Sequence, residues 1–302
     1  MRGVHSAVDD IRRNVFTEVA RLAYEGGDLS RVDEIPYKMI QGEVAKHRHD
    51  VFLERAIAGE RVRLAMGLSV RSVQTRSLLT EGMDHAAIAQ QYYEPPLINI
   101  IPYACHACPT NQYKVTENCQ NCLAASCQQV CPRDAISFVN GKSFIDSSKC
   151  IKCGRCKAAC SYQAIIRFER PCQEACGMDA IGSDELGRAK INYDKCVSCG
   201  MCLVNCPFAA IADKSQIFQT IMAIKSDVPV YVALAPAFVG QFGPDAIPEK
   251  MEAAFKRLGF AGVYEVAIFA DLCVQEVSSD LLAELPSMYS FMVTSCCPSW
   301  IN

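Results

Sequence analysis

Two segments of the chain carry four cysteines each at one narrow spacing, C-x2-C-x2-C-x3-C. The segments are KCIKCGRCKAACSYQAI, with Cys150, Cys153, Cys156 and Cys160, and KCVSCGMCLVNCPFAAI, with Cys196, Cys199, Cys202 and Cys206. A thiolate is both a nucleophile and a metal ligand. Four thiols packed so closely along a chain favour metal ligation, so the sequence predicts two metal-binding runs.

The spacing identifies the metal group as a 4Fe–4S cluster of the bacterial ferredoxin type. In such runs three close thiolates hold one cubane, and the fourth ligates the neighbouring cluster. A structural zinc site needs only four ligands, which usually come as two separated pairs. Zinc binding would therefore not explain why four cysteines lie so close together in each run. The chain has 19 cysteines, but a disulfide framework belongs to short secreted chains.

Eight further cysteines between residues 101 and 213 repeat parts of the same run. Two C-x2-C pairs resemble the head of a run, and two C-x3-C pairs resemble its tail: Cys105 and Cys108, Cys119 and Cys122 as heads, and Cys127 and Cys131, Cys172 and Cys176 as tails. Proximity joins the second head to the first tail. The first head is then left for the second tail, so one dicluster ferredoxin (119–160) is inserted in another (105–206).

The crossover of the fourth cysteine assigns every thiol of this block to one of four clusters. The predicted sets are Cys119, Cys122, Cys127 and Cys160 for cluster one, Cys150, Cys153, Cys156 and Cys131 for cluster two, Cys105, Cys108, Cys172 and Cys206 for cluster three, and Cys196, Cys199, Cys202 and Cys176 for cluster four. No cysteine of the block is left over, which is the main support for the nested arrangement.

Two features weigh against the nested arrangement. Ser161 follows Cys160, and Gly177 follows Cys176, where the ferredoxin pattern has proline. The alternative is that Cys105 and Cys108 are not ligands, in which case cluster three is absent or bound by other groups.

We predict an α+β multi-domain fold with three regions. Residues 1–100 contain no cysteine and show helical periodicity over 8–27, 42–68 and 85–96, which predicts a helical N-terminal domain. Residues 101–213 form the ferredoxin-like block, with a hairpin over 135–146. Residues 214–302 begin with a helix over 214–225. Strands (228–236, 262–270, 290–296) then alternate with helices (247–260, 272–285).

The alternation over 214–302 implies parallel strands joined by crossovers. Ligands of such sheets gather beyond the carboxyl ends of the strands. The predicted strand ends are Ala235-Pro236, Ala270-Asp271 and Ser295-Cys296. An active site of this domain is therefore expected beside the adjacent pair Cys296 and Cys297.

Composition excludes several classes of function. The net charge is -3, so no basic field suggests nucleic acid. The N-terminus lacks the apolar segment of a signal peptide, and no stretch is long enough to span a bilayer, so we expect a soluble, cytoplasmic protein without membrane partners. His47, His49 and His85 are expected at the surface rather than as ligands. Cys273 is expected to be a small buried residue.

The segment TSCCPSW near the C-terminus resembles the first H-cluster motif of the FeFe hydrogenases. The resemblance extends to LAPAFVGQFG, to GFAGVYEVAIFAD, to the ferredoxin block and to RVRLAMGL in the N-terminal region, and is nearest to the monomeric group B branch. It implies that 214–302 is the first part of an α/β H-cluster domain.

The resemblance also implies site residues. Cys297 would ligate the H-cluster cubane, Cys296 would relay protons beside the di-iron subsite, and Pro236 would lie near that subsite. Family members continue the proton path with glutamates, but Val277 stands where the relay glutamate aligns, so either the path differs in this branch or water or Glu276 substitutes.

The implied activity is reversible oxidation of H2, with electrons relayed to a ferredoxin or similar one-electron carrier and with H-cluster maturation proteins as further partners. The family has two more motifs downstream that supply the other cubane ligands. We therefore expect the chain to be an N-terminal fragment, inactive alone. The alternatives are a non-catalytic polyferredoxin and a hydrogen sensor. The first would have lost the chemistry of its last domain.

Overall fold

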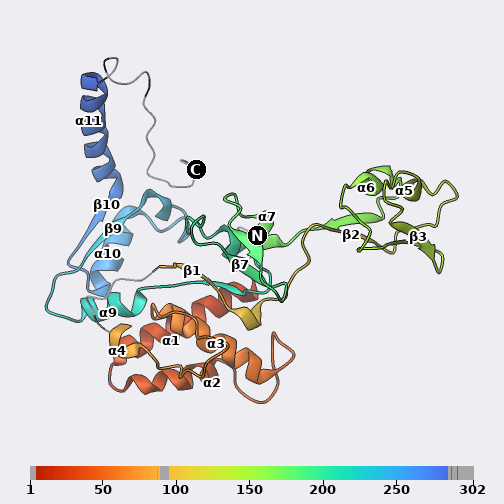
Figure 1. Cartoon of the computed structure of the whole chain (residues 1–302). Coiled ribbons are helices and arrows are strands. Elements are labelled where there is room, and N and C mark those ends of the chain that lie inside the picture. Colours follow the sequence, from red (N-terminus) through yellow and green to blue (C-terminus); the bar gives the residue numbers. More distant parts are fainter. Residues whose placement is uncertain (1–4, 87, 89–94, 285–286, 288–290, 292–302) are drawn as a thin grey trace. The chain divides into compact units, whose positions relative to one another are not determined.

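A computed structural model describes residues 5–86, 88, 95–284, 287 and 291 of the chain (Figure 1). It divides into two compact units, each made of two stretches: Met1–Asp9 with Ile98–Asp213, and Asp10–Leu97 with Lys214–Asn302. Helices and short strands are mixed along the chain, as the sequence predicts. The boundaries of the three regions remain a prediction. None of the helices in the described ranges is both long and apolar enough to cross a membrane.

The N-terminal part of the second unit is helical. Its elements are α1 (Ala7–Glu25), the 3-10 helix η1 (Leu29–Glu34), α2 (Ile35–Met39), α3 (Val51–Ala65) and α4 (Met83–Ala86). Helix α1 ends where Gly26 and Gly27 adopt positive φ, as the glycine pair predicts. Of the helix expected over 85–96, residues 87 and 89–94 lie outside the described residues.

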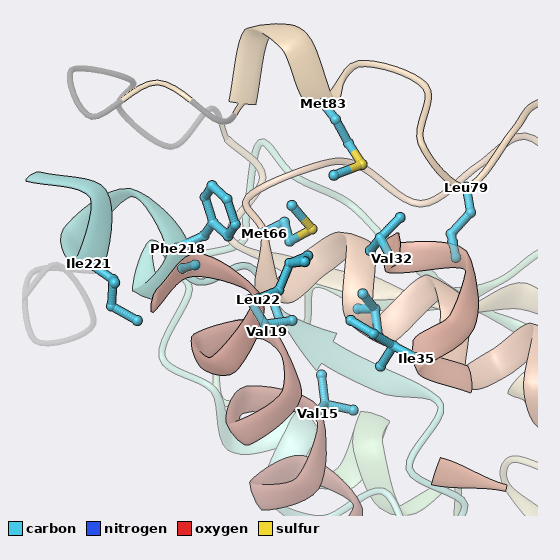
Figure 2. Packing of buried hydrophobic residues seen from close by; sticks show 13 residues of the cluster. Val15, Val19, Leu22, Val32, Ile35, Met66, Leu79, Met83, Phe218 and Ile221 are labelled. Atoms are coloured by element: carbon cyan, nitrogen blue, oxygen red, sulfur yellow. The ribbon is translucent and has the colours of Figure 1, made fainter. Parts of the chain in front are cut away.

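The larger hydrophobic cluster of these helices includes residues of α9 (Ile217–Ile224), which lies far along the sequence. Val15, Val19 and Leu22 lie on one face of α1, and Figure 2 shows them beside Phe218 and Ile221 of α9. The Gln219 side chain donates hydrogen bonds to the carbonyls of Met66 (2.8 Å) and Ala86 (2.7 Å). The first residues after the cysteine block therefore complete the core of the N-terminal helices.

The second long helix begins later than the sequence suggests. Periodicity predicts a helix from residue 42, but α3 begins at Val51. Asp50 caps it by accepting a hydrogen bond from the Leu53 N–H at 2.7 Å. Glu54 accepts from the N–H of Lys46 at 2.8 Å, which holds the preceding segment as a loop. These hydrogen bonds, rather than the apolar pattern of 42–50, therefore determine where α3 begins.

The first unit is built from short elements between cysteine loops. In chain order they are β1 (Ile98–Ile100), η2 (Pro102–Ala104), β2 (Gln112–Val115), α5 (Ser126–Gln129), β3 (Ile136–Val139), β4 (Lys142–Ile145), α6 (Arg155–Ala159), β5 (Ile165–Phe168), α7 (Pro171–Glu174), β6 (Ile181–Ser183), β7 (Ala189–Ile191), α8 (Met201–Val204) and β8 (Ile211–Asp213).

Strand pairing in this unit joins distant segments. Antiparallel pairs β3–β4 and β6–β7 are local hairpins, and the first confirms the hairpin expected over 135–146. Strand β1 pairs with β8, and β2 pairs with β5. The β2–β5 pair encloses residues 116–164, and the β1–β8 pair encloses both of these strands. In the sequence, the segment between β2 and β5 thus lies within the segment between β1 and β8.

The chain after α9 forms a strand–helix–strand–helix segment, as predicted. Strands β9 (Tyr231–Leu234) and β10 (Gly262–Glu265) pair in parallel, with Tyr231 opposite Gly262. Between them lie the 3-10 helix η3 (Pro236–Phe238) and α10 (Pro248–Leu258). The strand expected over 290–296 has only residue 291 among the described residues.

Two expectations for this segment are wrong. The strand predicted over 262–270 ends at Glu265, because its apolar half, VAIFA, opens the helix α11 (Val266–Glu284). The strand end expected at Ala270-Asp271 therefore lies within a helix. Cys273, expected to be buried, is exposed on α11. No residue of α11 is buried, although the helix carries large exposed apolar side chains such as Phe269 and Leu272.

We predict that the Phe218→Ala substitution destabilises the helical unit by about 3–5 kcal/mol, because it empties a fully buried site shared by α1 and α9. Urea unfolding followed by far-ultraviolet circular dichroism measures the effect. The matched control is Phe242→Ala, whose side chain is exposed and which should change stability by less than about 0.5 kcal/mol. Equal unfolding midpoints for the two variants would contradict the shared core.

Candidate iron–sulfur centres

All four C-x2-C heads share one backbone turn. The residue before the second cysteine has a positive φ in each head: Ala107 (46°), Asn121 (48°), Lys152 (60°) and Ser198 (56°). This conformation is uncommon for residues other than glycine, so its fourfold recurrence marks a repeated local structure. The head at Cys105 and Cys108 therefore has the same geometry as the heads inside the two intact runs.

The four C-x3-C tails also share one geometry. Each contains a short helix, and the third residue after its last cysteine has a positive φ: Asp134, Gln163, Asp179 and Ala209. The next backbone N–H donates to the last cysteine sulfur at 3.3 Å, in the pairs Ala135–Cys131, Ala164–Cys160, Ala180–Cys176 and Ala210–Cys206. The same turn therefore forms whether the residue after the last cysteine is proline, as in two of the tails, or Ser161 or Gly177, as in the other two.

One pocket gathers four cysteines from three distant segments. The pocket is lined by Cys105, Cys108, Cys172 and Cys206, with Arg170 and His106 beside them. Cys105 sulfur accepts a hydrogen bond from the Ala189 N–H at 3.4 Å. The His106 ring stacks on Phe208, with centroids 4.3 Å apart. These four thiols are the set that the sequence assigns to cluster three.

A second pocket of similar size gathers the set assigned to cluster four. The pocket is lined by Cys176, Cys196, Cys199 and Cys202 and by apolar residues that include Ile98, Ile181 and Met201. The two spaces are built alike, each from a head pair, the first cysteine of the tail assigned to that head and the last cysteine of the other run.

The thiols of the inner segment converge around a small apolar cluster. Cys127 and Cys156 are buried there with Ile136 and Ile165, and Cys131 and Cys160 pack against them. The structure places two thiols of the set for cluster one at Ser143. Its N–H donates to Cys119 sulfur at 3.4 Å, and its hydroxyl lies 3.6 Å from Cys127 sulfur.

The remaining thiols of the inner segment lie nearer the surface. Cys150 sulfur accepts a hydrogen bond from the Lys152 N–H at 3.4 Å. Cys122 and Cys153 are exposed. The described contacts thus place Cys119 with Cys127, but they do not place Cys122 against its predicted partner Cys160.

Burial favours the protonated form of four of these thiols by raising their pKa. Loss of solvent raises the pKa of Cys172 to about 11 and that of Cys202 to about 12, and neighbouring thiols add to both shifts. Burial also raises the pKa of Cys108 and Cys156. Because the ligand of iron is the thiolate, cluster binding at these positions must release protons.

The cysteine sets fit a 4Fe–4S cluster by their donor chemistry. Each outer pocket offers four thiols, and backbone N–H groups point at several of the sulfurs. Such hydrogen bonds stabilise a thiolate that carries negative charge and tune the potential of a cluster. Within the described part of the chain, no group of three or more His, Cys, Asp or Glu side chains is arranged to hold a single metal ion.

The residues that the resemblance assigns to the last domain are placed only in part. Pro236 opens η3 directly after β9 and is exposed. Glu276 and Val277 lie on α11. Cys296 and Cys297 lie outside the described residues.

Arg170 is the residue of these sites that the sequence analysis missed. It is 3% exposed and lines the first pocket. Its only sequence signal is its position before Pro171 and Cys172, at the start of a tail. An arginine at such a position is ordinarily read as a surface charge.

Comparison with protein-family models defines the class of the cysteine block. Residues 142–165 match a 4Fe-4S binding domain, and residues 166–217 match the LdpA Fe-S cluster-binding domain. The block thus consists of ferredoxin-like iron–sulfur domains. Residues 228–302 match the C-terminal domain of the iron-only hydrogenase large subunit. The chain is therefore an iron-only (FeFe) hydrogenase relative that combines ferredoxin-like domains with a hydrogenase domain.

Individual relatives agree with this class. Iron hydrogenase 1 of Clostridium pasteurianum is 30% identical over 225 residues, which cover 68% of this chain and 38% of that relative. A subunit of an NADP-reducing hydrogenase of Solidesulfovibrio fructosivorans is 30% identical over 107 residues, which cover 30% of this chain and 18% of that protein. The ferredoxin 7Fe of Hydrogenibacillus schlegelii is 43% identical over 53 residues, covering 18% of this chain and 68% of the ferredoxin.

We predict that Gly154→Ala weakens the inner segment more than Gly200→Ala. Both glycines precede a tail helix at positive φ, so both substitutions carry the same backbone cost of roughly 1–2 kcal/mol. At Gly154 the new methyl group would also lie 2.7 Å from the Tyr113 hydroxyl, whereas Gly200 has open space. The measurement is the temperature at which each variant loses its visible iron–sulfur absorbance.

The Tyr113→Phe substitution is the control, because it removes the hydroxyl that the methyl group would meet. It should restore most of the difference in the Gly154→Ala background and leave Gly200→Ala unchanged. An equal decrease of the transition temperature in the two glycine variants would show that the Tyr113 hydroxyl makes no steric contact with residue 154.

Proposed function

We propose that this chain carries the electron relay and part of the active-site domain of an FeFe hydrogenase, which interconverts H2 with protons and electrons. The observation that carries the proposal is the succession of domains. A block of ferredoxin-like domains is followed directly by residues 228–302, which match the hydrogenase domain. The aligned part covers 38% of the clostridial relative, so the activity of a whole protein is part of the proposal.

The proposal includes four 4Fe–4S clusters held by the sixteen cysteines of the block, in the four sets given above. When bound, these clusters store and pass single electrons. The two outer pockets support the assignment, because each is lined by one complete set. The protein contributes the thiolates, the N–H groups that face the sulfurs and the apolar walls that limit access of water.

The proposal also includes the nested arrangement, with segment 119–160 inserted in 105–206, and three domains at 1–100, 101–213 and 214–302. The β2–β5 pair supports the nesting, since it brackets the inner segment inside the outer one. Cys105 and Cys108 support it further, because they meet Cys172 rather than the nearer tail at Cys127.

For the last domain we propose roles that follow the family motif. Cys297 would hold the cubane of the H-cluster, the group that supplies the hydrogen chemistry when bound. Cys296 would move protons beside it, and Pro236 would line the same site. Glu276 is the candidate for the next proton carrier on α11, where Val277 cannot serve. Membership of the monomeric group B branch belongs to the same proposal.

The proposed partners are a ferredoxin or similar one-electron carrier and the proteins that mature the H-cluster. Support for the carrier comes from the ferredoxin-like relatives and from the exposed thiols Cys122 and Cys153, which leave the inner clusters close to the surface. The protein is expected to act in the cytoplasm.

Iron content tests the cluster assignment. Anaerobically purified chain should hold about sixteen irons, and the double variant Cys105→Ala/Cys108→Ala about twelve. Cys273→Ala is the matched control, since its thiol is exposed on α11, and it should keep the full iron content. About twelve irons in the unsubstituted chain would show that Cys105 and Cys108 hold no cluster.

Hydrogen uptake by the matured product of the natural gene tests the enzyme proposal. Cys297→Ala should abolish uptake, and Cys296→Ala should lower the rate by about 100-fold or more, because a positioned proton carrier contributes about that factor. Both variants should keep the ferredoxin-type iron. Absence of uptake by the unsubstituted product, or uptake unchanged in both variants, would overturn the proposal.

A further inference from the structure

Arg170 lies at the point where the inserted segment rejoins the outer one. It follows β5, which pairs with β2, and it precedes α7, which carries Cys172. Its side chain is 3% exposed and lines the pocket of Cys105, Cys108, Cys172 and Cys206. A buried arginine needs hydrogen-bond partners and a counter-charge to offset the loss of water.

The guanidinium group ties three separate segments together. Its Nε and Nη2 donate to the carbonyl oxygen of Cys108 at 3.1 and 3.0 Å. Its Nη1 donates to the carbonyl of Gly182 in β6 at 2.9 Å, and Nη2 donates to the carbonyl of Gly187 in the following hairpin turn at 2.7 Å. Arg170 therefore fixes the head at Cys108 to the tail that it precedes.

The other tails need no such tie. Their helices are entered from left-handed residues, Ala125, Gly154 and Gly200, which lie a few positions after the second cysteine of the head. Arg170 holds the corresponding position before α7, with an extended backbone (φ −72°), and its head lies before the whole inserted segment. A hydrogen-bonded side chain thus replaces the short covalent link.

The hydrogen bonds that the described residues make to the Arg170 guanidinium do not neutralise its charge. Its partners in the described part of the chain are carbonyl oxygens, which are neutral. A cluster with four thiolates carries net negative charge, so in this pocket it would supply a counter-charge to the guanidinium.

We propose that Arg170 is a positioning residue for cluster three, which closes the split site and makes its reduction potential more positive than the site would have without the arginine. The inference rests on the four-cluster assignment proposed above. A positive charge beside a cluster stabilises its reduced form, which bears one more negative charge.

The test compares the whole chain with Arg170→Gln and Arg170→Lys by iron analysis and by redox titration followed by electron paramagnetic resonance. Arg167→Gln is the matched control, because Arg167 lies three residues earlier on β5 and is exposed. In Arg170→Gln we expect one of four transitions to move to a more negative potential, or about a quarter of the iron to be lost. Arg170→Lys keeps the charge and should shift the potential less.

Each outcome decides one statement. Full iron and four unshifted transitions in Arg170→Gln would overturn the inference, and so would loss of all four clusters together, which indicates general unfolding. An equal shift in Arg170→Lys and Arg170→Gln would overturn the role of charge. Only three transitions in the unsubstituted chain would instead refute the four-cluster assignment, before any variant is compared.

Discussion

Convergence of cysteine side chains is the constraint on which the middle of this chain depends. The inner segment buries only a few apolar residues, among them Ile136 and Ile165, and two of the thiols themselves. A domain with so small a core relies on other links for its stability. Metal ligation offers such links, because binding to the folded ligand set adds directly to the free energy of folding. A left-handed turn recurs in all four heads and in all four tails, and an N–H···S hydrogen bond recurs in all four tails. These repeated local features orient the cysteine side chains.

Much of this arrangement could be predicted from the sequence because cysteine spacing is a strong local signal. The count of heads and tails grouped the same cysteines that line each outer pocket, including the distant pair Cys105 and Cys172, and their role as cluster ligands stays a prediction. The hairpin β3–β4 and the parallel pair β9–β10 also followed from simple periodicity. Each of these rests on residue types that have few alternative uses.

Other features could not be predicted because they depend on contacts or on competing local signals. The run VAIFA has the apolar character of a strand, yet it opens α11. Asp50 and Glu54 decide where α3 begins through hydrogen bonds that periodicity does not reveal. Arg170 has no sequence signal beyond its position before Pro171 and Cys172, because its role arises from backbone carbonyls that come together only in the fold. Burial of Cys273 was wrongly expected because residue type alone does not say which neighbours a helix has.

The pocket lined by Cys105, Cys108, Cys172 and Cys206 also has a consequence for synthesis, because its cysteines are made at widely separated times. Cys105 and Cys108 leave the ribosome long before Cys206, which completes the wall around them. At about 5–20 residues per second the head must wait roughly 5–20 s for its last partner, while the inner segment is already whole. During that interval its two thiols are open to oxidation and to stray metal ions. Assembly of the outer site therefore requires that the thiols of Cys105 and Cys108 stay reduced during this interval. It also favours delivery of iron after Cys206 has been made.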